Sequence, residues 1–221
     1  MSVDPYAAAR LVDACAAAIV VIGVLMAGTR SIGRSILLVG LQAVLLGVAG
    51  IGVGIATGAP NLIVGGLLAG GAKGVAVPLI LGRILRQSPV RTERHPLIGP
   101  RTSLLAAILI VFAAASAVDG AALRGSLGAS NALPAAVAEI LTGLLITMSR
   151  RKGLSIIVGL LVFENGLALT AFSLTYGMPL VIEFGVVFDL LIAIVAVWVY
   201  TRRMITVIGT TDTTEMTTLR R

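Results

Sequence analysis

Five ionisable side chains lie within long apolar stretches of this sequence, and their types and positions indicate chemistry inside a membrane. They are Lys73, Glu139, Glu164, Glu183 and Asp189. A charged side chain at the centre of a bilayer costs ~2.5–3.5 kcal/mol, so an ionisable residue there is a functional candidate by default. Buried carboxylates can take up and release a proton, and a lysine that moves between two of them can control its passage. The five residues therefore predict a proton relay.

These residues differ in depth. Glu164 and Asp189 lie near the middle of their apolar stretches, whereas Glu139 and Glu183 lie closer to the outer boundary. Glu183 and Asp189 are six residues apart, about 600° of helical rotation, so each needs a partner outside its own helix. Three alternatives to a relay stay open. Glu139 and Glu183 would be hydrated at the interface, Glu164 and Asp189 would form hydrogen bonds between helices, and Lys73 would snorkel to the surface.

The composition excludes the common classes of soluble protein. The 221 residues are 57% hydrophobic and 12% charged, with a mean hydropathy of +1.05, whereas about a quarter of the residues in globular domains are charged. The net charge of +7 comes from short basic clusters between apolar runs, which does not suit a nucleic-acid-binding module. Cys15 is the single cysteine, and no group of Cys and His has metal-ligand spacing. We therefore expect no metal and no cofactor in this chain.

The apolar runs have the length of membrane-spanning helices, since a bilayer core needs about 20 residues per helix. The sequence predicts an all-α, polytopic transmembrane bundle of about seven spans, near residues 10–28, 35–57, 61–82, 103–123, 132–149, 154–175 and 179–200. Basic residues follow every odd-numbered span, at Arg30 and Arg34, at Arg83 to Arg101, at Arg150 to Lys152, and at Arg202 and Arg203. The positive-inside rule then places the N-terminus outside and the C-terminus in the cytoplasm of a cell inner (plasma) membrane protein.

Two parts of the chain share a charge pattern that indicates an internal repeat. Residues 30–86 and 150–202 each begin with a basic turn, enter a helix beginning SILLVGLQ or SIIVGLLVFE, and return to an arginine cluster. Lys73 stands thirteen residues before Arg86, and Asp189 thirteen residues before Arg202. Two parallel three-helix repeats need one extra crossing between them. We therefore expect a three-span repeat at 1–101, a linking span at 102–130, a second repeat at 131–203 and a cytoplasmic tail at 204–221.

Glycines recur at every fourth position in the second and third predicted spans. Faces of this kind let helix backbones approach closely. We expect helix packing at Gly50, Gly54, Gly58, Gly66, Gly70 and Gly74.

The second half of the chain resembles a known family, the membrane component E of hydrogenase-4-type complexes, which is related to the three-helix K-type subunit of respiratory complex I. The residues that resemble it are SRRKGLSIIVGLLVFENGLALTAF and MPLVIEFGVVFDLLIAIVAVWVYTRR. The K-type subunit has an arginine pair that opens a helix with a Gly-Leu step and a buried glutamate. A second glutamate follows, about thirteen residues before a terminal arginine cluster. Asp189 matches the second acid, and Glu164 falls about one helical turn later than the first.

The resemblance implies a non-redox subunit of a membrane arm in which Glu164 and Asp189 are central relay groups. Lys73, Glu183 and Glu139 would be access or partner residues. Antiporter-like membrane subunits and hydrogenase-like or dehydrogenase-like peripheral subunits would be the partners, so the chain itself would be a non-catalytic subunit of an oxidoreductase complex. Two alternatives stay open, namely a structural adaptor between antiporter-like subunits and a stand-alone cation or small-solute transporter.

Overall fold

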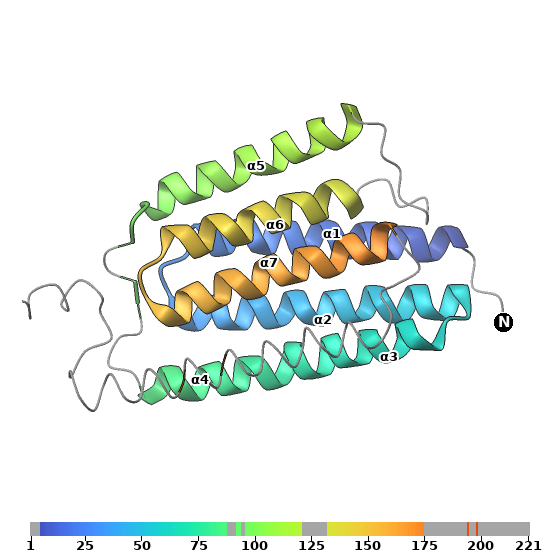
Figure 1. Ribbon diagram of the computed structural model, residues 1–221, viewed down its shortest axis with the longest axis horizontal. Helices are drawn as coiled ribbons and strands as arrows, with labels where there is room; N and C mark the ends of the chain where they lie inside the picture. Colours follow the sequence, from blue (N-terminus) through green and yellow to red (C-terminus); the bar gives the residue numbers. More distant parts are fainter. Residues whose placement is uncertain are drawn as a thin grey trace, which may run out of the picture.

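The computed structural model describes residues 5–87, 92–93, 96–120 and 132–174, together with Ile194 and Trp198. Every regular element within these ranges is helical (Figure 1). The elements are α1 (Pro5–Ala27), α2 (Ile32–Thr57), α3 (Pro60–Leu68), the π-helical turn η1 (Ala69–Ala76), α4 (Val77–Gln87), α5 (Pro100–Gly120), α6 (Ala132–Ser149) and α7 (Gly153–Leu174). The α3, η1 and α4 elements follow one another without a break and form one span, which we call the third span.

Six helices in the described ranges are long and apolar enough to cross a membrane. They correspond to the first six predicted spans, so the prediction of an all-α, polytopic membrane bundle is confirmed. The predicted span at 179–200 lies outside the described residues except for Ile194, which is buried, and Trp198. The division into two repeats, a linking span and a tail stays a prediction.

Local sequence signals set the ends of α2. Ser31 precedes the helix in an extended conformation, and its hydroxyl oxygen accepts a hydrogen bond from the Arg34 N–H at 3.4 Å, as expected of an N-cap. Gly58 ends the helix with φ of +66°, a left-handed conformation that favours glycine. Pro60 lies in the first turn of α3, where its missing N–H costs nothing. The α2–α3 turn is therefore short and tight.

Four helices, α1, α2, α6 and α7, pack around the centre of the bundle. The helix α5 lies outside α6 and α1, and the third span lies against α2 on the other side (Figure 1). The buried apolar residues form two clusters. One includes Ile22, Val39, Ile146 and Val162, and the other includes Ile19, Leu46, Ala136 and Leu169. Each central helix therefore passes from one cluster to the other near its middle.

The connections that follow the first, third and fifth spans meet at one end of the bundle, at the left in Figure 1. The Arg150 guanidinium donates a hydrogen bond to the Ala27 carbonyl at 2.7 Å, and the Glu93 N–H donates to the Arg30 carbonyl at 2.9 Å. We call this the basic end, because Arg30, Arg34, Arg83, Arg86 and Arg101 are exposed there. The alternation of basic connections read from the sequence agrees with this arrangement, while its direction across the membrane stays a prediction.

Candidate functional site

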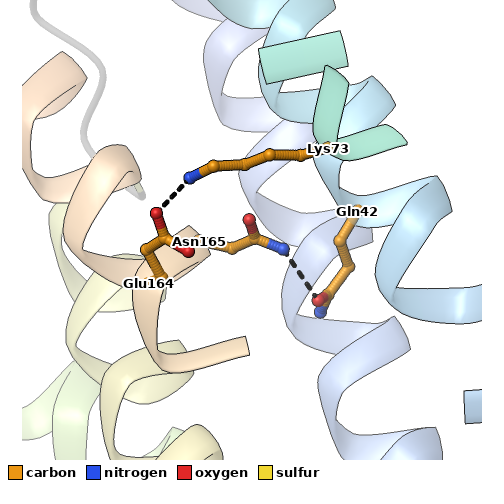
Figure 2. A network of polar contacts seen from close by, with 4 residues as sticks. All are labelled: Gln42, Lys73, Glu164 and Asn165. Atoms are coloured by element: carbon orange, nitrogen blue, oxygen red, sulfur yellow. Dashed lines mark hydrogen bonds and ion pairs between the residues drawn. The ribbon is translucent and has the colours of Figure 1, made fainter. Parts of the chain in front are cut away.

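Lys73 and Glu164 form a buried ion pair between the third span and α7. The Lys73 ammonium extends from η1 toward α7 and donates a hydrogen bond to Oε1 of Glu164 (Figure 2). Their side chains are only 7% and 12% exposed. A pair so far from solvent is poorly screened by salt, and each charge depends on the other to offset the loss of its hydration.

The backbone that presents Lys73 is a π-helical turn of eight residues, Ala69–Ala76, inside an otherwise α-helical span. At its end the Val77 N–H bonds to the carbonyl of Ala72, five residues back. The turn contains Gly70, Gly71 and Gly74, which lower the preference for a regular α-helix. Turns of this type occur often at functional sites, so the local backbone marks the position of Lys73 as unusual.

A second group of polar side chains surrounds Gln42 of α2. The Gln42 amide Nε2 donates to the Ile19 carbonyl of α1 at 2.9 Å and to Oε1 of Glu139 on α6. Its Oε1 accepts from Nδ2 of Asn165 on α7 at 3.4 Å (Figure 2). Gln42 and Glu139 are fully buried, and Asn165 is 2% exposed. One amide therefore joins four central helices.

Glu139 lies against α1 at Gly23. A Cβ atom added to Gly23 would stand 2.5 Å from Oε2 and 2.8 Å from Oε1 of the Glu139 carboxyl, so glycine is the residue that leaves room for it. Oε2 of Glu139 and Oε2 of Glu164 are both buried, and neither has a hydrogen-bond partner in the part of the chain that the structure describes. Each carboxyl group thus has one oxygen that is held and one that is available to a proton or a water molecule.

The two groups meet on α7, where Glu164 and Asn165 are consecutive residues (Figure 2). Together they form one polar layer, which we call the buried network: Gln42, Lys73, Glu139, Glu164 and Asn165. The layer separates the two apolar clusters, since Val162 belongs to one of them and Leu169 to the other. Polar groups at the middle of a membrane bundle are costly, and here they are concentrated in one place.

Three of the five predicted relay residues lie in the buried network, namely Lys73, Glu139 and Glu164. The hydrated alternative for Glu139 was wrong, because α6 packs between α1, α5 and α7 and no part of this side chain is exposed. The snorkelling alternative for Lys73 was also wrong, because its ammonium turns inward to Glu164. Glu183 and Asp189 lie outside the described residues.

Sequence reasoning missed Gln42, Asn165 and Gly23. The signal for the first two was present, because an amide inside an apolar run needs partners as a carboxylate does. Their significance depends on partners that are distant in sequence, since 97 residues separate Gln42 from Glu139 and 123 residues separate it from Asn165. The position of Gly23 opposite Glu139 has no sequence signal.

Most of the predicted packing glycines lie between α2 and the third span. A Cβ added at Gly66 would stand 2.7 Å from the Gly47 carbonyl oxygen, and one at Gly74 would stand 2.6 Å from a methyl group of Val44. Gly70 faces Gly47 at 3.7 Å, Gly54 faces Ile63, and Gly50 is buried within α2. The prediction for Gly58 was wrong, because a Cβ there would have no atom within 4 Å and the residue ends α2 instead.

A second glycine interface, between α6 and α7, was not predicted. A Cβ on Gly143 would stand 2.3 Å from the Phe163 nitrogen, one on Gly159 would stand 2.6 Å from the Thr147 nitrogen, and one on Gly166 would stand 2.6 Å from the Ile140 nitrogen. The backbones of the two helices are therefore close along much of their length. This contact fixes α7, and with it Glu164 and Asn165, relative to Glu139 on α6.

The described residues contain no group of three or more His, Cys, Asp or Glu that would suit a metal ion. The expectation that the chain holds no cofactor stays a prediction. The chemistry available within the buried network is the transfer of protons between carboxyl groups, oriented by amides and by one lysine.

Comparison with known proteins identifies the family. No family model matches the chain, and no solved structure matches it significantly. The uncharacterized protein Rv0085 of Mycobacterium tuberculosis is 30% identical over 212 residues, which is 95% of this chain and 96% of that protein. Hydrogenase-4 component E of Escherichia coli K12 and that of Shigella flexneri are each 32% identical over 148 residues, 67% of this chain and 68% of theirs. The resemblance noted in the second half of the sequence is thereby confirmed, and the chain belongs to the hydrogenase-4 component E family.

Proposed function

We propose that this chain is a non-redox membrane subunit of a hydrogenase-4-like, complex I-like assembly, and that its buried network moves protons coupled to electron transfer in other subunits. The observation on which the proposal rests is the ion pair of Lys73 and Glu164, contiguous with Gln42, Asn165 and Glu139 at the middle of the bundle. Antiporter-like membrane subunits and peripheral hydrogenase-like subunits are the expected partners, and the name of the relatives supports a hydrogenase complex. The basic end would face the cytoplasm.

The residues have different parts in the proposed path. Glu139 and Glu164 are the groups that bind and release a proton, each through its available Oε2 atom. Amides do not exchange their protons readily, so Gln42 and Asn165 orient the carboxyl groups, and water bridges the remaining gaps. Lys73 stabilises the ionised form of Glu164, and a movement of its ammonium away from that carboxylate would favour proton uptake there. Glu183 and Asp189 are proposed to extend the path.

The structural adaptor is the weaker candidate. The glycine faces of the second and third spans would favour an adaptor if they offered a surface to other subunits. These faces instead pack against each other within this chain, since Gly66 of the third span lies against Gly47 of α2 and Gly74 against Val44. An adaptor also has no use for a buried ion pair, which stabilises a bundle no better than apolar residues of similar volume.

The test is the number of protons moved per electron by the intact complex in sealed membrane vesicles. We expect Glu164→Gln and Glu139→Gln to lower this ratio while electron transfer and the amount of assembled complex persist. Ser116→Ala is the matched control, because Ser116 lies on α5 outside the network and its hydroxyl donates to the Phe112 carbonyl of its own helix. An unchanged ratio in both glutamate variants would contradict the proposal.

A further inference from the structure

Glu93 at the basic end is a buried acid that the proton path does not use. It is 2% exposed and lies in the connection between α4 and α5. Its Oε1 accepts hydrogen bonds from the backbone N–H groups of Arg151 at 2.8 Å and Lys152 at 3.1 Å. Its Oε2 accepts from the Ser155 hydroxyl at 2.6 Å. The two backbone donors directly precede α7, and Ser155 lies in its first turn.

Glu93 thus caps α7 from a distant part of the sequence. The N-terminus of a helix favours a nearby negative charge, and Glu93 supplies one by binding the backbone directly before α7 and a hydroxyl in its first turn. Lys152, directly before α7, has no side-chain acceptor with which to cap it. The connection that supplies Glu93 is itself held, since Thr92 pairs with Ser31 in a single β-bridge and the Leu97 N–H donates to the Ser149 carbonyl at 2.9 Å.

The cap lies across the same two segments as the ion pair. Within the described ranges, the third span packs against α2 and not extensively against α7. In the described part of the chain, polar contacts join the third span and its following connection to α7 at mid-membrane, through Lys73–Glu164, and at the basic end, through the Glu93 cap. Lys73 stands about 21 Å from the end of α4, and Glu164 about 17 Å from the start of α7, at a rise of ~1.5 Å per residue. The two contacts therefore hold the same pair of segments together at two depths of the bundle.

We propose that Glu93 is a positioning residue, which holds the start of α7 to the connection after the third span and so keeps Glu164 within reach of Lys73. Its consequence for proton transfer rests on the proposed function, but its effect on the ion pair does not. Loss of the cap lets the two segments separate, and the Lys73 amine then becomes accessible.

The experiment compares Glu93→Ala with the unaltered chain in the intact complex. The chain contains two lysines, Lys73 and Lys152. Reductive methylation followed by mass spectrometry therefore measures the rate at which the Lys73 amine is modified. We expect methylation of Lys73 to be at least about tenfold faster in Glu93→Ala, since three hydrogen bonds to a charged group are lost and one alone corresponds to about that factor. We also expect the proton-to-electron ratio to fall. The control is Arg101→Gln, an exposed change at the same end, which should leave both unchanged.

Unchanged methylation of Lys73 in Glu93→Ala would overturn the inference, as would an equal rise in Arg101→Gln. If Glu93→Ala prevents assembly, Glu93→Gln replaces it, since its amide oxygen can still accept from the Arg151 and Lys152 N–H groups and a smaller rise is expected. If Lys73 is methylated faster in Glu93→Ala but both Glu93→Ala and Glu164→Gln pump normally, the proposed function is refuted and the inference stands. Loss of pumping in Glu164→Gln alone, with methylation unchanged in Glu93→Ala, would refute only the inference.

Discussion

Replacing Lys73 by methionine would leave the Glu164 carboxylate buried without its cationic partner. Both side chains are largely shielded, at 7% and 12% exposure, so solvent offers the remaining charge little compensation. Removal of one member of a buried pair costs roughly 3–5 kcal/mol in the free energy of unfolding, whereas its replacement by apolar residues of similar volume is often neutral. We therefore expect Lys73→Met and Glu164→Met each to destabilise the chain by roughly 3 kcal/mol, and the double variant to lie within about 1 kcal/mol of the original.

The assay is a double-mutant cycle on the equilibrium unfolding of the purified chain in mixed detergent micelles. Hydrogen bonds between membrane helices average only ~0.6 kcal/mol, because the unfolded state in a membrane-like solvent also finds partners. A coupling energy of at least ~2 kcal/mol therefore distinguishes the ion pair from an ordinary interhelical hydrogen bond. Additive single effects would refute the reasoning, since they would mean that the two charges do not depend on each other.

The same double variant separates stability from function. We expect the complex that contains Lys73→Met and Glu164→Met to assemble normally and to transfer electrons, but to move fewer protons per electron. Normal pumping by this stable double variant would show that the ion pair is not needed for proton movement.

The remaining predictions concern glycines. Gly23→Ala places a Cβ 2.5 Å from the Glu139 carboxyl, which is the flexible end of a side chain, so we expect assembly to persist and the proton-to-electron ratio to fall. Gly143→Ala places a Cβ 2.3 Å from the Phe163 backbone nitrogen, which cannot move alone, so we expect α6 and α7 to separate and the amount of complex in membranes to drop severalfold. Gly82→Ala has no atom within 4 Å of its new Cβ, and we expect thermal unfolding to show unchanged or slightly higher stability, by up to about 1 kcal/mol. A loss of stability in Gly82→Ala equal to that in Gly143→Ala would contradict the packing argument.

The basic end contains a further buried cation, Arg150. Burial lowers the pKa of its guanidinium, while the nearby Glu93 carboxylate raises it and Arg30 lowers it again. An arginine side chain stays charged at physiological pH despite such shifts. Arg150 therefore acts as a fixed positive charge on the carbonyls of Met26 and Ala27 at the end of α1, where a cation is favourable.

Much of the fold could be predicted because the relevant properties are local in sequence. The length of an apolar run decides whether a helix can cross a bilayer, and the basic residues at its ends indicate which connections share a side. Gly58 shows where such local reasoning fails. The recurrence of glycine at every fourth position suggested that Gly58 packs against another helix. Its left-handed φ of +66° shows that it instead serves as the C-terminal cap of α2.

The candidate site was likewise predictable only in part. That Lys73 and Glu164 belong in a membrane interior follows from the sequence, because each stands well inside an apolar run long enough to cross a bilayer. The sequence left Glu139 open to hydration at the outer boundary, and the packing of α6 decided its burial. Which of them pair does not follow, since Lys73 and Glu164 are 91 residues apart and their contact depends on how α2 and α7 pack and on the π-helical turn at Ala69–Ala76. The joining of Gln42 to Glu139, the space at Gly23 and the cap from Glu93 were likewise decided by tertiary structure. Hydropathy places a helix in the bilayer, but only close packing sets its rotation and depth relative to its neighbours, and hydrogen bonds require both to within a fraction of an ångström.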